Sequence, residues 1–483
     1  MNAKFRTFTA NIFRAVSVSA VRLLISVVLT LFLPKVLGIE EYSYWQLYQF
    51  YLTYIVYSSL GWCEGLYLKH GGKQYDELDR TQMSGQFWAL ALYELLFSVI
   101  VGTVLVYNVT GGNKQAAVAF AFVSAFLDIL RYCLQSVLQT TNRIADYARV
   151  AIAERLLFFA FVIIALAIGR RDFRSLIYAE LAARALTLLL AVFICRKVVL
   201  TRPPPPRAVL REAASVLRMG YKLLAAAFAS QLIIGIVRFA IEQHWGTLTF
   251  GKVSLTLSLS NMVVTCIGAV GVVLFPMLKQ TAPERLAALY GIARMATTLP
   301  ILALLLFYTP ISLLLGMWLP QYADSLKYLA ILLPMCIYEA RSFMLTDTYF
   351  KVYQQGGRIL LVNAVSVVLS LAFTGLTVFL LNSLDAAMLS IVILVSFKSI
   401  FAELLLQKQL GRNAWLDILP EAALTWLFIA ANWMLDGGLA TLIYACGFGV
   451  YLVIRRRQLL AMLRSAKRLA GRTGGEEEGP THG

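Results

Sequence analysis

The sequence predicts an all-α integral membrane protein with about fourteen transmembrane helices. Of its 483 residues, 59% are hydrophobic and 14% are charged, whereas soluble domains carry about 45–50% apolar and about 25% charged residues. The apolar residues lie in runs near the length of about 20 residues that a helix needs to cross a bilayer core. The runs do not alternate polar with apolar residues, as barrel strands do, so their backbone groups must be paired within helices.

Along the chain these runs are separated by short polar or glycine-rich connections. Connections as short as 382–384 and 436–438 make the flanking helices antiparallel neighbours. The expected spans are residues 12–34, 43–68, 84–108, 116–138, 149–169, 176–195, 219–242, 248–273, 290–316, 325–348, 359–381, 385–406, 416–435 and 439–454.

Lysine and arginine are unevenly distributed among the connections. With the N-terminus inside, most of the 43 basic residues lie in or beside inner loops, as the positive-inside rule requires. Arg170 and Arg171, in an outer loop, are a local exception. The basic N-terminal segment leads into a run long enough to span, without a small-residue cleavage site, and is read as the first span. We therefore expect both termini in the cytoplasm, and the net charge of +17 requires no nucleic-acid partner.

Two basic segments help to divide the chain. In the first, residues 196–222, Pro203 to Pro206 predict a stiff extended stretch, and 207–222 a basic amphipathic helix on the anionic inner leaflet. The second is a cytoplasmic tail. The expected parts are an N-terminal six-helix lobe (1–195), the linker (196–222), a C-terminal six-helix lobe (223–406), two additional helices (407–454) and the tail (455–483).

A short internal repeat supports two related halves. Gly38 begins a turn that is followed by Tyr42 and later Leu47, and Gly246 begins one followed by Phe250 and Leu255. Six helices separate the two turns, so the halves share one orientation and are related by an axis along the membrane normal.

The chain lacks the motifs of several enzyme classes. It contains no GxxxxGK[ST] phosphate loop, HExxH, DxD or GxSxG. Its six cysteines are scattered singly within apolar runs, which indicates small core residues and no metal site or disulfide. We expect no cofactor and no catalytic site, and the short outer loops favour transport over bond formation.

Charged residues inside the spans need a reason, because each costs roughly 2.5–3.5 kcal/mol at mid-bilayer. Asp128 with Arg131, and Glu180 with Arg184, have the spacing to neutralise each other on one helix face. Glu154 and Arg155 lie near the inner interface, within reach of water.

Arg22 and Glu64 are more informative. Arg22 lies near the middle of the first span, with no acid within fifteen residues on either side. Arg22 therefore either faces a cavity, where it binds a ligand, or forms an ion pair with an acid on another helix. Glu64 on the second span is one candidate for that acid. Glu64 lies between Gly61 and Gly65, which indicate close helix packing, and we expect its carboxylate to face a cavity.

Three further cations are candidates for substrate binding. Arg238 lies in the seventh span and can either pair with Glu242, four residues on, or serve a ligand. Arg341, like Arg294, has no good local partner and can reach the inner surface by snorkelling. Lys252 opens the eighth span near the outer surface.

The chain resembles a known family of transporters. The arginine-bearing first span and several loop motifs are similar to the polysaccharide transporter (O-antigen flippase-like) family of the multidrug/oligosaccharidyl-lipid/polysaccharide (MOP) exporter superfamily. The motifs are Leu37-Gly38-Ile39-Glu40-Glu41-Tyr42, Leu60-Gly61, Gly71-Gly72-Lys73, Leu319-Pro320-Gln321-Tyr322-Ala323-Asp324-Ser325 and Leu329-Ala330-Ile331-Leu332-Leu333-Pro334. Where the family's seventh helix often carries an Asp-Arg pair, Val237-Arg238 keeps only the arginine.

This resemblance implies two six-helix lobes around a central cavity, plus two C-terminal helices, in the bacterial inner membrane. Cations of the first and seventh helices would face a polyprenyl-pyrophosphate-linked oligosaccharide, which alternating access moves to the outer leaflet. Membrane lipids and polysaccharide assembly proteins are the other implied partners.

Three alternatives stay open. A small-molecule exporter of the same superfamily would rely on membrane acids more than on unpaired arginines. An integral-membrane glycosyltransferase or polymerase would turn over a sugar nucleotide. A lipid-scrambling or scaffold protein would depend little on its intramembrane charges.

Overall fold

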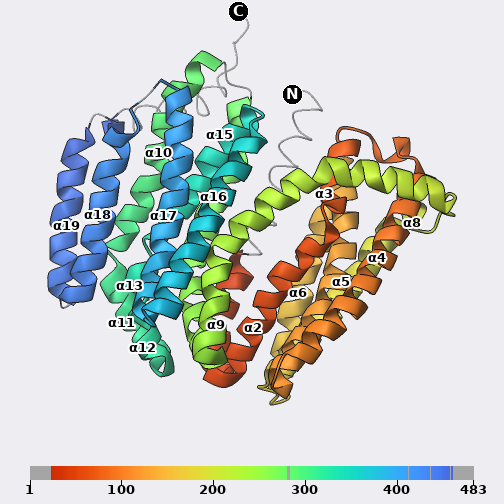
Figure 1. The fold of residues 1–483 in the computed structure, drawn as a ribbon, viewed down its shortest axis with the longest axis horizontal. Coiled ribbons are helices and arrows are strands. Elements are labelled where there is room, and N and C mark those ends of the chain that lie inside the picture. Colours follow the sequence, from red (N-terminus) through yellow and green to blue (C-terminus); the bar gives the residue numbers. More distant parts are fainter. Residues whose placement is uncertain (1–22, 280–282, 412, 436, 457, 461–483) are drawn as a thin grey trace, which may run out of the picture. The chain divides into compact units, whose positions relative to one another are not determined.

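All regular elements among the described residues are helical, as the sequence predicts (Figure 1). The computed structural model describes residues 23–279, 283–411, 413–435, 437–456 and 458–460. The chain divides into two compact units, Met1–Met262 with Asn363–Asn382, and Val263–Val362 with Ser383–Gly483. The lobe boundaries expected from the sequence remain predictions.

The first unit is built mainly from long helices joined by short connections. Its elements are helix Leu23–Leu37, α2 (Ile39–Ile55), η1 (Val56–Ser59), α3 (Trp62–His70), η2 (Tyr75–Glu77), α4 (Arg80–Asn108), α5 (Gly112–Thr140), α6 (Ile144–Ala167), α7 (Phe173–Ile194), α8 (Arg196–Val199), most of α9 (Pro206–Lys279), and the later part of α16 (Gly356–Thr374) with η5 (Gly375–Leu380).

The second unit contains more short and interrupted helices. Its elements are the end of α9, α10 (Pro283–Leu305), α11 (Tyr308–Trp318), η3 (Pro320–Tyr322), α12 (Ala323–Leu326), α13 (Leu329–Leu332), α14 (Met335–Arg341), η4 (Ser342–Thr346), α15 (Asp347–Val352), the start of α16, α17 (Leu384–Gln409), α18 (Trp415–Met434) and α19 (Gly437–Ile454).

The described residues contain nine helices long and apolar enough to cross a membrane, or ten if the pair Leu289–Leu305 and Tyr308–Trp318, bent by 57°, is one span. The number is below fourteen for four reasons. Residues Pro206–Thr265 count once, although the sharp turn at Gly246 divides them into the seventh and eighth expected spans. The second span is broken into α2 and α3, the first is described only from Leu23, and α18, the thirteenth expected span, is not among the helices that are long and apolar enough. The chain is thus a multi-pass membrane protein whose spans are frequently interrupted.

The two glycine turns of the internal repeat share one backbone conformation. Gly38 has φ 80° and ψ 171°, and Gly246 has φ 81° and ψ 173°. This region is accessible almost only to glycine. The aromatic residues that follow, Tyr42 and Phe250, are both buried. The repeat read from the sequence is therefore matched by two equivalent turns.

Contacts between the two repeats are themselves paired. A Cβ on Gly251 would meet Oγ of Ser43, its counterpart in the repeat, at 1.9 Å. Tyr42 lies near Ser258, and the counterparts of these two residues, Phe250 and Phe50, place their rings 5.3 Å apart. The start of α2 and the second half of α9 thus contact each other through corresponding positions of the repeat.

Glycines also hold the break in the second span against the start of α9. Leu60 and Gly61 adopt positive φ values of 51° and 87° between η1 and α3. A Cβ on Gly65 would lie 2.1 Å from the carbonyl oxygen of Val216, and one on Gly220 would lie 1.9 Å from that of Gly61. As the sequence suggests, these glycines allow two helix backbones to touch.

We expect Gly220→Ala to destabilise the protein by about 1–3 kcal/mol, the usual cost of overpacking, because backbone atoms must move apart. Thermal unfolding in detergent measures this effect. Gly449→Ala on α19 is the matched control, since its Cβ would meet nothing within 4 Å. An equal or smaller loss of stability in Gly220→Ala than in Gly449→Ala would contradict the close packing.

Candidate functional site

Arg238 of α9 lies in an aromatic environment inside the first unit. Its guanidinium carbon is 5.0 Å from the ring centre of Phe50 and 5.1 Å from that of Phe250. Nη2 donates a hydrogen bond of 2.9 Å to Oγ of Ser254. Arg238 and Ser254 are equally distant in sequence from Gly246, so the sharp turn at this glycine brings the two together. The site is therefore built by the turn and by the packing of α2 on α9.

No carboxylate among the described residues forms an ion pair with Arg238, and its buried Nε has no hydrogen-bond partner there. The local pair with Glu242, which the sequence left open, does not form. Glu242 instead accepts from Lys114 Nζ of α5 at 2.6 Å. The acid nearest to Arg238 in sequence is thus neutralised by Lys114.

This arrangement suits the binding of an anion. Cation–π contacts contribute about 0.5–2 kcal/mol each, which offsets part of the cost of holding a guanidinium inside the membrane. They leave the charge uncompensated and donor groups available. A planar guanidinium matches the oxygens of phosphate, so a phosphate-containing ligand would complete the site.

Glu64 borders a pocket of about 500 Å³ in the same unit. Its Oε2 atom is buried without a hydrogen-bond partner among the described residues. The expectation that Glu64 faces a cavity agrees with this position. The pocket has an apolar part formed by Val56, Ile129, Leu223, Leu224 and Ala227. Its polar part offers hydrogen-bonding groups that suit a hydroxyl-rich ligand, from Tyr57, Ser59, Asp128, Arg131, Tyr132, Gln135, Ser136, Gln139 and Tyr147.

The two short-range ion pairs expected in this unit are confirmed. Asp128 pairs with Arg131, and Glu180 pairs with Arg184 at 2.6 Å. They join into one network, because Arg184 also contacts Asp128 at 3.3 Å. Glu154, expected to reach water at the interface, is instead buried and pairs with Arg131 at 2.9 Å.

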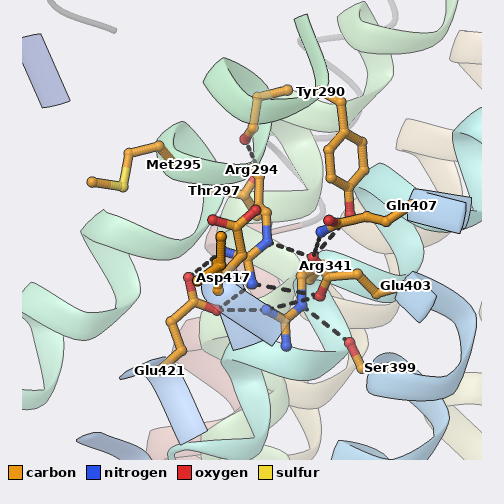
Figure 2. A network of polar contacts seen from close by, with 12 residues as sticks. Tyr290, Arg294, Met295, Thr297, Arg341, Ser399, Glu403, Gln407, Asp417 and Glu421 are labelled. Carbon is orange, nitrogen blue, oxygen red and sulfur yellow. Dashed lines mark hydrogen bonds and ion pairs between the residues drawn. The ribbon is translucent and has the colours of Figure 1, made fainter. Parts of the chain in front are cut away.

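Arg341 is fully buried in a second network, in the second unit (Figure 2). Its Nη1 lies 2.6 Å from Glu421 Oε2 and 3.3 Å from Glu403 Oε2, and Nε donates to Ser399. Arg294 contacts the same two carboxylates, so two cations face two anions. Snorkelling to the surface is therefore wrong for Arg341 and Arg294, and in this structure Arg341 has no exposed charge to offer a ligand.

The structure says less about the other two expected cations, Lys252 and Arg22. Lys252 is half-buried and lies two residues before Ser254, the acceptor of Arg238. Arg22 lies outside the described residues, so its role remains a prediction.

Sequence reasoning missed the partners of these charges, because they come from distant helices. Glu403 and Glu421 on α17 and α18 gave no local signal of a shared site with Arg341. Glu94 of α4 also went unnoticed as a buried acid.

No protein-family model matches the chain, and no curated protein matches its sequence. Solved structures do match. The lipid II flippase MurJ in an inward closed conformation has a TM-score of 0.63 at 11% identity, over 93% of this chain and 100% of that chain. An inward-facing multidrug resistance MATE family transporter of the MOP superfamily has 0.59 at 14% identity, over 82% and 94%. A MOP superfamily transporter from Pyrococcus furiosus has 0.50 at 13% identity, over 83% and 95%. The chain therefore has the fold of MOP-superfamily transporters.

Proposed function

We propose that the protein is a flippase for polyprenyl-pyrophosphate-linked oligosaccharides. It would move them from the inner to the outer leaflet of a bacterial cytoplasmic membrane, by alternating access, for cell-surface polysaccharide synthesis. The observation that carries the proposal is Arg238, a membrane arginine that has no ion pair with a carboxylate among the described residues and whose nearest acid in sequence, Glu242, pairs with Lys114. The fold shared with a lipid II flippase supports a lipid-linked substrate, and polysaccharide assembly proteins are expected partners.

In this proposal Arg238 binds the pyrophosphate, and Arg22 and Lys252 add positive charge. Arg341 serves to hold the second unit together, because its charge is already balanced by Glu403 and Glu421. The pocket beside Glu64 offers hydrogen-bonding groups to the sugar, and the polyprenyl chain stays in lipid.

A second candidate is a small-molecule exporter, which the pocket acid Glu64 favours through its unpaired Oε2. The two candidates depend on opposite charges. Loss of transport in Glu64→Gln with normal transport in Arg238→Gln would favour the exporter.

The proposal includes a source of energy. Two negative charges moving outward across an inside-negative membrane gain about 2.3 kcal/mol per charge per 100 mV. We therefore expect an inside-negative potential to accelerate flipping several-fold in proteoliposomes that contain a polyprenyl-pyrophosphate-linked sugar. The control is the same vesicles with the potential collapsed by an ionophore. Equal rates in both would exclude the potential as the drive.

A further inference from the structure

Glu94 of α4 stands apart from every other buried acid in the described part of the chain. Seven carboxylate side chains there are at least nine-tenths buried. Six have an ion-pair partner, namely Glu154, Glu180, Glu242, Glu403, Asp417 and Glu421. Glu94, which is 1% exposed, has no ion pair within the described residues.

The surroundings of Glu94 supply little to stabilise a negative charge. Oε2 accepts a hydrogen bond of 2.8 Å from Ser58 Oγ, while Oε1 is buried without a partner. On the same face of α4, Phe87, Leu90 and Ala91 belong to the apolar core. An ionised carboxylate in such surroundings costs far more than a neutral one, so burial favours the neutral carboxyl.

Ser58 connects Glu94 to the break in the second span. It belongs to η1, and its carbonyl oxygen accepts from Tyr93 Oη at 3.1 Å. Its neighbours Tyr57 and Ser59 line the pocket that Glu64 also borders. One side of η1 therefore meets Glu94, and the other side meets the pocket.

We propose that Glu94 is a proton-binding site whose charge state is coupled to η1. In the neutral state the carboxyl holds one proton. Loss of that proton to the pocket leaves an anion that needs more hydrogen-bond donors, and the irregular segment at Leu60 and Gly61 is the adjacent backbone able to rearrange. The nearby titratable side chains are Tyr93 and Cys63. Neither can carry a positive charge, so neither can balance the negative charge of an ionised Glu94.

The inference deepens the proposed function by naming the proton as the coupling ion, and to that extent rests on it. Proton binding itself is measurable without transport. In detergent-solubilised protein, the infrared C=O stretching band of a protonated carboxyl should persist at neutral pH, where exposed acids are ionised. We expect Glu94→Gln to remove one component of this band and Ser58→Ala to shift that component, because the shift reports loss of the hydrogen bond.

Two matched variants complete the test. Glu77→Gln replaces an exposed acid and should leave the band unchanged. Glu64→Gln should still show the component of the band that we assign to Glu94. A spectrum in which Glu94→Gln and wild type share the same band would overturn the proton site, and Ser58→Ala decides the matter if the glutamine variant does not fold.

In proteoliposomes, an imposed pH gradient should change the flipping rate of wild type and not of Glu94→Gln. Equal sensitivity in both would overturn the coupling. Absence of flipping at every pH, with the infrared band intact, would instead overturn the proposed function alone.

Discussion

Replacing Arg238 with glutamine is expected to reduce flipping of a polyprenyl-pyrophosphate-linked sugar by roughly 10- to 100-fold, since hydrogen bonds to charged groups contribute about 1.5–3 kcal/mol and about 1.4 kcal/mol is tenfold. The fold should survive, because no carboxylate in the described structure depends on this arginine for its charge balance. Flipping rates in proteoliposomes and thermal unfolding in detergent, measured together, separate the two effects.

Two control variants sharpen this prediction. Arg238→Lys keeps the charge and loses the planar fork, so an intermediate rate is expected. Arg170→Gln removes an exposed cation from a loop and should transport normally. A normal rate in Arg238→Gln would contradict the anion site.

Arg341→Met is expected to destabilise the protein by about 3–5 kcal/mol, the usual cost of removing one partner from a buried ion pair. It would leave Glu403 and Glu421 facing Arg294 alone, with one uncompensated negative charge (Figure 2). Combining it with Glu421→Gln restores neutrality, so the double variant should recover part of the lost stability. Thermal and denaturant unfolding in detergent measure both effects.

Lys327→Met provides the surface control for this network. Lys327 pairs with Asp385 at 3.7 Å, and both side chains are about half exposed (52% and 53%). Exposed ion pairs contribute about 0–1 kcal/mol, so this variant should lie near wild type. A loss in Arg341→Met no larger than in Lys327→Met would show that the network does not stabilise the second unit.

Patterns among residues close in sequence predicted contacts and turns that the structure contains. Asp128 with Arg131, and Glu180 with Arg184, are a helical turn apart, so geometry alone brings them together. Gly38 and Gly246 were recognisable because one residue type suits their conformation. Composition and run length were sufficient to predict an all-α membrane protein.

The sequence did not predict which charged residues pair across distant helices. Arg341 and Glu421 are 80 residues apart, and no periodicity reports which faces of two helices will meet. The same limit applies to Lys114, which takes Glu242 away from Arg238. The helix count differs partly because hydropathy does not show where a span is broken, as at Leu60 and Gly61.

The most direct test of the central claim is equilibrium binding of a polyprenyl pyrophosphate to the purified protein in detergent, with the corresponding polyprenol as the uncharged control. Wild type should prefer the pyrophosphate, and Arg238→Gln should lose most of that preference, by roughly 10- to 100-fold in Kd, while polyprenol binding stays the same. Equal pyrophosphate affinity in wild type and Arg238→Gln would contradict the claim that this arginine is the anion site.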